Sequence, residues 1–482
     1  MTDGRIPEEI EVPAPDPMPV PSPVIEAPLT PNGWRELGEV LWLSFPIIVT
    51  MFSYTLMSAI DVVMVGHHSA AELAAVGPAA SAFFLIASLM MGTLSITNTF
   101  VAQSVGRGEK HAAPRYVWQA VHLTAIWGAI AWSLSPLAPK LFAWAGHETH
   151  IQIYEVSYFE YMLLRIPALG FWMALSGFYQ ATKRPVIPMI VGLVGNVFNL
   201  ALNYALIFGE WGFPEMGITG AAVATVVATY FQAALMFVMF LGPRTHGEYG
   251  SRNDIGVELV KLWRMIRVGL PSGLSWSLEN ACWTLFLLKV VGSLGAAALA
   301  ANNATMQIIH LSFMPVIGLN IGVQAIVGQH IGMGDHAGAT RRVHRAMGLA
   351  FAFMVTMGLM FVVFRRGLIG LFCPGEAAAG IVAMGSTMLI FAAIFQAFDS
   401  VAIICYGALK GAGDTVFPMC TSVACGWFVF LPLAYGLTHT LKLGVAGAWL
   451  GVTVYVALLA GINFWRFSSG AWRKIDLFKG EA

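Results

Sequence analysis

Three carboxylates lie inside long apolar stretches of this chain: Asp61 in SYTLMSAIDVVMVG, Glu279 in GLSWSLENACWTLF and Asp399 in IFQAFDSVAIICYG. A carboxylate in hydrocarbon is costly, and such residues commonly mark a path for ions or protons. Glu279 and Asp399 lie deep in their stretches, and if their faces meet, the pair can hold a proton or a cation. The alternative is that both are neutral and hydrogen-bonded. We therefore predict a cation, proton or substrate site in the C-terminal half.

Possible partners of Asp61 occur in two later apolar stretches. Asn199 and Asn203 in GNVFNLALNYALIFG are four residues apart and share one helix face, and Thr225 lies in AAVATVVATY. With Asp61 they offer hard oxygen ligands for Na⁺, or a polar surrounding for a protonatable acid. The alternative is a set of hydrogen bonds that only join helices. We predict a cation or proton site in the N-terminal half, made of Asp61, Asn199, Asn203 and Thr225.

Signals for enzymatic chemistry are absent from the sequence. HETH at 147–150 lacks the two histidines four residues apart of a zinc protease, and there is no Walker loop, dinucleotide fingerprint or nucleophile elbow. The five cysteines form no CxxC pair, so we interpret them as packing residues. We predict a protein that is not an enzyme and has no resident cofactor. A mobile Na⁺ or H⁺ is expected at the sites above, and no other metal.

The composition is that of a membrane protein. The 482 residues are 57% hydrophobic and 11% charged, whereas a soluble domain carries about 25% charged residues. Lys plus Arg and Asp plus Glu both number 26, so charge gives no sign of a nucleic-acid partner. We therefore expect the lipid bilayer to surround the chain.

The apolar stretches predict an all-α membrane protein of twelve transmembrane helices, since about 20 apolar residues cross the hydrocarbon core. The predicted spans are 40–65, 73–103, 117–136, 153–180, 188–208, 218–242, 269–292, 298–329, 346–364, 380–409, 417–438 and 444–466. An even number of spans puts both termini on one side. Most Lys and Arg then share that side, while Lys140, Arg365, Arg366 and Lys442 lie on the other. This asymmetry predicts a multi-pass bacterial inner-membrane protein with cytoplasmic termini.

Four blocks of sequence recur in the same order in the two halves. They are VGHHSAAELAAVG and VGSLGAAALAANN (65–77, 291–303), VAQSVGRGE and VGQHIGMGD (101–109, 327–335), YQATK and YGALK (179–183, 406–410), and GITGAAVAT and GVAGAWLGV (217–225, 444–452). Six spans per half give both halves the same orientation, so the repeat is parallel, with a pseudo-twofold axis along the membrane normal. Two such lobes are expected to enclose a cavity that opens alternately to each side.

The chain is therefore expected to have five parts. The predicted divisions are a disordered, Pro-rich and acidic cytoplasmic tail (1–34), an N-terminal six-helix lobe (35–242), a cytoplasmic linker between the lobes (243–268), a C-terminal six-helix lobe (269–467) and a cytoplasmic tail (468–482). The first tail has no apolar core, so we do not interpret it as a cleaved signal peptide.

The segments FPIIVTMFSYTLMSAIDVVMVGHHSAAELAAVG, VAQSVGRGE, and FPMC after YGALKGAGDT resemble the multidrug and toxic compound extrusion (MATE) family, closest to its bacterial NorM-type members. The resemblance covers about residues 35–467. It implies a two-lobe, twelve-helix antiporter that exports drugs against inward Na⁺ or H⁺. It also implies that Asp61 is a cation or proton site and that Glu279 and Asp399 are an acidic pair. Phe395 departs from members with a Tyr one turn before the second acid, which removes a possible oxygen ligand.

We expect antiport of amphipathic organic cations, that is multidrug efflux, by a monomer. The alternative is a lipid-linked precursor flippase of the same superfamily. Such a protein needs a cationic cavity for a diphosphate, and Arg165 and Lys289 are the only basic residues within the predicted spans. From another class, a channel or a membrane-bound enzyme is the remaining alternative.

Overall fold

The computed structural model describes residues 33–146, 148–372 and 379–479 as one compact unit. The predicted tail at 1–34 lies almost wholly outside the described residues. Within the described ranges every regular element is a helix. The structure therefore agrees with the all-α prediction.

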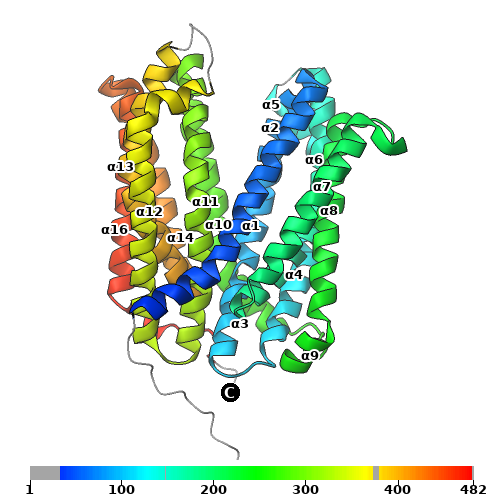
Figure 1. The fold of residues 1–482 in the computed structure, drawn as a ribbon. Coiled ribbons are helices and arrows are strands. Elements are labelled where there is room, and N and C mark those ends of the chain that lie inside the picture. Colours follow the sequence, from blue (N-terminus) through cyan, green and yellow to red (C-terminus); the bar gives the residue numbers. More distant parts are fainter. Residues whose placement is uncertain (1–32, 147, 373–378, 480–482) are drawn as a thin grey trace, which may run out of the picture. The chain divides into compact units, whose positions relative to one another are not determined.

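The described helices form two groups, which Figure 1 shows in blue to green and in green to red. The N-terminal group contains α1 (Gly33–His68), α2 (Ala70–Leu94), α3 (Ile96–Gly106), α4 (Ala113–Ser133), α5 (Ala138–Ala145), α6 (Thr149–Ala181), α7 (Val186–Phe208), α8 (Gly217–Phe240) and α9 (Pro243–Tyr249). The C-terminal group contains α10 (Leu259–Leu285), α11 (Ala296–Gly332), α12 (His336–Gly370), α13 (Ala379–Gly411), α14 (Val416–Ala424), α15 (Leu431–Tyr435) and α16 (Gly444–Ser468). Short π-helical segments follow α10 and flank α15.

Eleven helical segments of the described chain are long and apolar enough to cross a membrane. They coincide with eleven of the twelve predicted spans. The predicted span 269–292 is helical, as α10 and the π-helical segment Phe286–Val291 after it, but it is not among the eleven. It is less apolar, because Glu279 and Asn280 lie in its middle and Lys289 near its end.

Several helices extend beyond their predicted spans. α12 begins at His336, ten residues before the predicted start at 346, and the predicted linker 243–268 contains α9 and the first turns of α10. Apolarity reports only the part of a helix that lies in hydrocarbon, whereas backbone hydrogen bonding continues into polar surroundings.

The two groups meet along α1, α2, α3, α10 and α11. Gly92 of α2 faces Gly273 of α10, and a Cβ on Gly92 would collide with the backbone of Gly273. Gly106 of α3 is pressed against the Gln329 carbonyl of α11 in the same way. Small residues let helix backbones touch. The contact between the groups is therefore made by main chain as much as by side chains.

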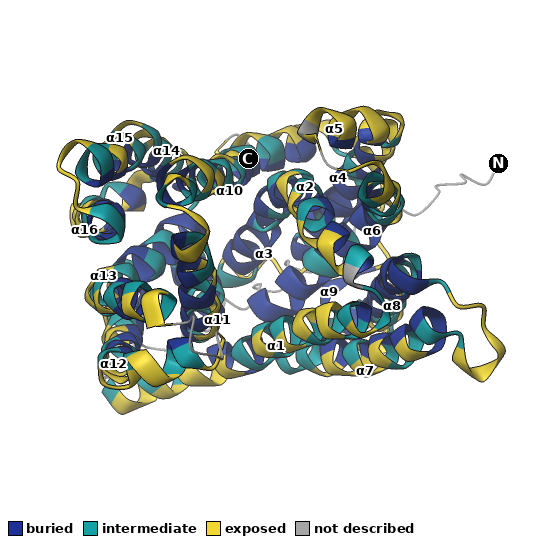
Figure 2. Cartoon of the chain, turned by 90° about the horizontal axis from the view of Figure 1, so that it is seen from above, coloured by how far each residue is buried: buried dark blue, intermediate teal, exposed yellow. Residues whose placement is uncertain are grey.

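One end of the described unit carries α9, the turn between α3 and α4, and the turn between α11 and α12; we call it the α9 end (Figure 1). The first turns of α1 reach across to α12 at this end. Viewed along the helices, buried residues face the interior and many exposed ones face outward (Figure 2). The outward residues include large apolar side chains, as expected where lipid is the solvent.

Candidate functional site

The N-terminal group contains a polar cluster around Asp61 of α1. Asn203 Nδ2 of α7 donates to Asp61 Oδ1 at 2.5 Å and to Asn199 Oδ1 at 2.9 Å. Asn199 Nδ2 in turn lies 3.4 Å from Thr225 Oγ1 of α8. Turning the Asn199 amide over brings its nitrogen 3.2 Å from Asp61 Oδ1. All four residues predicted for the N-terminal site therefore lie together, at the meeting of three helices.

Two further features of this Asp61 cluster were not foreseen from the sequence. Asn203 Oδ1 is buried without a hydrogen-bond partner, so an oxygen next to the carboxylate is left unsatisfied. Tyr158 of α6 lies close enough to Asp61 to interact with it electrostatically. A buried acceptor without a donor is costly unless water or an ion serves it. An anionic carboxylate with a spare amide oxygen fits the hard oxygen ligands that Na⁺ prefers.

Arg165 of α6 is connected to the same cluster through Thr229, one turn along α8 from Thr225. Its Nε donates to Thr229 Oγ1 at 3.0 Å, and Thr229 Oγ1 donates to the Thr225 carbonyl at 2.7 Å. The guanidinium also lies over the ring of Tyr54, 5.5 Å from its centroid. This buried arginine thus holds α1, α6 and α8 together beside the Asp61 cluster.

The C-terminal group contains a cavity of about 670 Å³ that both predicted carboxylates line. Glu279 comes from α10 and Asp399 from α13, and Glu279 lies close enough to act electrostatically on Asp399. Phe84 of α2 is the contribution of the N-terminal group to the lining. This cavity is thus lined almost wholly by one helix group, and the cavity expected between two lobes stays a prediction.

The wall of this cavity combines aromatic rings with unsatisfied oxygens. Trp276, Trp283, Phe313, Phe395, Tyr406 and Tyr455 are among the lining residues. Asn302 Oδ1 and Asn463 Oδ1, also in the lining, are buried without hydrogen-bond partners within the described chain. Rings attract organic cations through their π faces, and carboxylates supply the charge. The wall therefore suits a bulky apolar cation better than a small, strongly hydrated one.

Tyr455 of α16 is the residue of this cavity that sequence reasoning missed. Its hydroxyl donates to Glu279 Oε1 at 3.3 Å. Phe395 takes the position at which some family members have a Tyr. Its ring packs between the rings of Phe313 and Trp449. A phenol therefore does reach the acidic pair, but from another helix. The signal available was one Tyr in the last apolar stretch, VTVYVALL, which does not reveal the face it occupies.

The Asp61 cluster and the acidic cavity are separate. Asp61 and its three predicted partners belong to α1, α7 and α8, and none of them lines the cavity. Within the described residues no three His, Cys, Asp or Glu side chains come together as a metal site. The structure therefore has two separate polar sites, one in each helix group.

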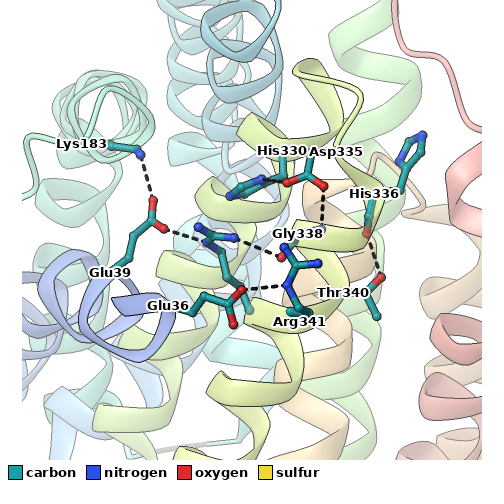
Figure 3. Close-up of polar contacts among 10 residues, drawn as sticks. Glu36, Glu39, Lys183, His330, Asp335, His336, Gly338, Thr340 and Arg341 are labelled. Carbon is teal, nitrogen blue, oxygen red and sulfur yellow. Dashed lines mark hydrogen bonds and ion pairs between the residues drawn. The ribbon is translucent and has the colours of Figure 1, made fainter. Parts of the chain in front are cut away.

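A third charged cluster joins the groups at the α9 end (Figure 3). Arg342 Nε of α12 donates to Glu39 Oε2 of α1 at 2.7 Å, and Arg341 Nε donates to Glu36 Oε1 at 2.7 Å. Lys183, between α6 and α7, donates to Glu39 Oε1 at 2.8 Å. We call the pairs Glu39–Arg342 and Glu36–Arg341 the inter-group ion pairs, whereas Lys183 belongs to the same helix group as Glu39. The sequence carried their signal in the spacing of Glu36 and Glu39 and in RRVHR at 341–345, but nothing indicated that these segments meet.

Polar contacts to main-chain carbonyls reinforce the junction at the same end. Thr99 Oγ1 of α3 donates to the Lys410 carbonyl of α13 at 3.0 Å, and Gln103 Nε2 donates to the Gly411 carbonyl at 3.0 Å. Gln329 Nε2 of α11 donates to the Ala181 carbonyl of α6. The groups are therefore bonded to each other at the α9 end by ion pairs and by hydrogen bonds.

The fold and these sites define a polytopic helical membrane protein with partly buried acids among its helices. The MatE family model matches residues 46–205 and 271–436, and the chain belongs to the MatE family. The resemblance predicted from the sequence is thus confirmed.

Relatives and solved structures extend the likeness to nearly the whole chain. The multidrug resistance protein NorM of Burkholderia vietnamiensis is 31% identical and aligns over 91% of this chain and 95% of its own. The probable multidrug resistance protein NorM of Deinococcus radiodurans is also 31% identical, over 89% and 94%. A multidrug resistance MATE transporter of the MOP superfamily, solved in an outward-facing conformation, superposes with a TM-score of 0.84 at 21% identity, over 92% of this chain and 100% of its own. This last likeness shows the shared fold.

Proposed function

We propose that this protein is a secondary active antiporter that exports amphipathic organic cations, as in multidrug efflux, in exchange for Na⁺ or H⁺. The observation that carries the proposal is the cavity with two carboxylates, Glu279 and Asp399, among aromatic walls. The printed names of the relatives, multidrug resistance proteins, agree with it. The flippase alternative has no such support, since the lining of this cavity in the described residues includes neither Lys nor Arg to hold a diphosphate.

The two sites divide the work. The organic cation lies in the cavity, where its charge meets Glu279 and Asp399 and its rings stack on the walls. The coupling ion binds Asp61 together with Asn199, Asn203 and Thr225, or is shared with the acidic pair. Export is coupled when ion and cargo favour different conformations or exclude one another. The gradient then supplies the work of each cycle.

The helix groups correspond, in this proposal, to two six-helix lobes, at 35–242 and 269–467, related by a parallel repeat. The segments that match the family model support the repeat, because the second begins 225 residues after the first. α10 with its π-helical extension is the remaining span, which completes the set of twelve. The acidic residue Glu279 explains its lower apolarity. The chain functions as a monomer.

We place the α9 end in the cytoplasm of a bacterial cell, with both termini on that side. The basic turns support this orientation, since Arg107, Lys110, Lys183 and Arg244 all lie at or beside the α9 end. Because the groups are bonded together at this end, the conformation described is the one closed to the cytoplasm. The cation site therefore faces outward, ready for release of cargo and capture of the ion.

Efflux from proteoliposomes tests the proposal. A fluorescent organic cation is loaded, and a Na⁺ gradient and a proton gradient are imposed separately. At least one gradient should drive export by the unaltered protein, and Asp61→Asn and Glu279→Gln should each remove gradient-driven export. Glu109→Gln, at an exposed acid in the turn after α3, is the matched control and should transport normally.

The possible outcomes separate the alternatives. Ion current without cargo movement would indicate a channel. Undiminished gradient-driven export by Asp61→Asn would reject Asp61 as the ion site, and undiminished export by Glu279→Gln would reject the cavity as the cargo site.

A further inference from the structure

The start of α12 carries a basic hollow that the proposed transport cycle does not use. Thr340, Arg341, His344 and Arg345 line this hollow of about 270 Å³. We call it the α12 basic hollow. It lies beside the inter-group ion pairs, but it opens outward, and the side chains of Arg341 and Arg345 are 41% and 54% exposed.

The cations of the hollow exceed the anions that serve them. Glu36 accepts from Arg341 Nε at 2.7 Å, while Arg345 Nε lies 3.9 Å from the same carboxylate, too far for a hydrogen bond. Arg473 approaches from the C-terminal segment, with Nη2 3.4 Å from Thr340 Oγ1. One carboxylate, Glu36, therefore faces the two guanidinium groups of Arg341 and Arg345, and the hollow keeps an excess of positive charge with donors in reach of an anion.

His344 forms part of the wall of the hollow. Its ring is exposed, and Nδ1 donates to the Thr340 carbonyl at 2.8 Å, so Nε2 of the neutral ring is an acceptor and the donors of the hollow are the guanidinium groups. A planar guanidinium suits a tetrahedral phosphate, whose oxygens accept several hydrogen bonds at once. The chemistry of the hollow is therefore that of a phosphate ester site.

The exposed face of α12 shows where such a phosphate would come from. From Arg345 toward the other end of α12 this face continues through Gly348, Ala352, Thr356, Leu359 and Val363, all exposed and, apart from Thr356, apolar. The steps of three and four residues keep these positions on one side of the helix. A basic site for a phosphate thus lies next to an apolar stripe. This arrangement matches the polar headgroup and the apolar acyl chains of a phospholipid.

The length of the stripe matches a bilayer. The next exposed arginine on α12 is Arg366, and the 21 residues from Arg345 to Arg366 span roughly 31 Å at about 1.5 Å per residue. The hydrocarbon core is about 30 Å thick. Arg345 therefore lies at the headgroup level of one leaflet and Arg366 at that of the other.

We propose that the α12 basic hollow binds the phosphate headgroup of an anionic phospholipid of the cytoplasmic leaflet, with the acyl chains along the exposed face of α12. The leaflet assignment rests on the proposed orientation of the chain; the binding itself does not depend on transport. The same phosphate chemistry occurs in soluble phosphate, but the apolar stripe selects the lipid. Arg341 is shared between Glu36 and the lipid, so occupancy of the hollow also competes with an inter-group ion pair.

Binding is measured on the purified full-length protein in detergent by native mass spectrometry, with phosphatidylglycerol added at increasing concentration. A basic residue near an anionic lipid surface contributes about 1 kcal/mol, or about a fivefold change in affinity. Arg345→Gln should weaken the tightest binding event about fivefold, and Arg345→Lys should recover part of the loss. Arg366→Gln, an exposed arginine at the opposite end of α12, should leave it unchanged.

Several results would overturn the inference. Equal binding by Arg345→Gln and the unaltered protein, or an equal loss in Arg366→Gln, would show that the hollow is not a specific site. Phosphatidylcholine bound as tightly as phosphatidylglycerol would remove the anionic preference. Displacement of the lipid by excess inorganic phosphate would assign the hollow to soluble phosphate. Each of these measurements reports equilibrium binding of lipid. A failure of the proposed transport function would therefore not change what they say about the hollow.

Discussion

Breaking the contact between Glu39 and Arg342 should release the α9 end, because this ion pair joins the two helix groups. Glu39 Oε2 accepts from Arg342 Nε at 2.7 Å, and the side chains are 25% and 17% exposed. A hydrogen bond to a charged partner contributes about 1.5–3 kcal/mol, and partial exposure favours the lower figure. Losing about 1.5 kcal/mol raises the ratio of open to closed α9 ends about tenfold.

Lys183 contacts the same carboxylate and therefore provides a control. It donates to the other oxygen of Glu39 at 2.8 Å, but it belongs to the same helix group as Glu39. Lys183→Gln removes an ion pair of similar length without removing a bond between the groups. Its ratio of open to closed ends should therefore stay within about twofold of the unaltered protein.

Distances between spin labels measure this ratio directly. Labels at Glu109→Cys and Met333→Cys, exposed turns of the two groups at the α9 end, report their separation once the native cysteines are replaced. Glu39→Gln and Arg342→Gln should each enlarge the long-distance population about tenfold. The double variant should resemble either single variant, because the same pair is lost. An Arg342→Gln protein with the unaltered distribution, or fully additive effects, would refute the reasoning.

Three more predictions follow from contacts within the fold. Gly92→Ala should lower the free energy of unfolding by about 1–3 kcal/mol, because its Cβ meets the backbone of α10; a thermal melt should show this, with Gly77→Ala, whose Cβ meets open space on the same helix, as control. Tyr455→Phe should weaken binding of an organic cation about tenfold or less, seen by calorimetry, because Glu279 loses a donor; equal affinity would exclude this role. Asn203→Ala should raise the Na⁺ or H⁺ concentration for half-maximal efflux by about tenfold with maximal efflux retained; an unchanged ion dependence would count against the Asp61 cluster.

Much of the fold could be predicted from the sequence because hydrocarbon imposes a simple rule. Every backbone group must be bonded within the membrane, so each long apolar stretch is a helix. The predicted span 269–292 illustrates where the rule weakens. Glu279, Asn280 and Lys289 lower its apolarity, although the segment is helical. Helix ends in polar surroundings, such as the start of α12, leave no apolar signal at all.

The acidic residues of the candidate sites could be predicted from the sequence, but not all of the residues that contact them. Asp61 could be joined to Asn199 and Asn203 because the asparagine spacing defines one helix face. Tyr455 could not be joined to Glu279, since that contact depends on how α16 is rotated against α10. The inter-group ion pairs could not be predicted from the sequence for the same reason. Charges near helix ends are common, and only the packing of α1 against α12 decides which of them meet.

The glycine contact between α2 and α10 has a consequence for how this scaffold diversifies. With backbone against backbone at Gly92 and Gly273, neither position can accept a larger residue without separating the two groups. The cavity wall, in contrast, is built of side chains that can be exchanged one at a time. Substitutions can therefore accumulate in the cavity wall, while the glycine contact between the groups tolerates few of them.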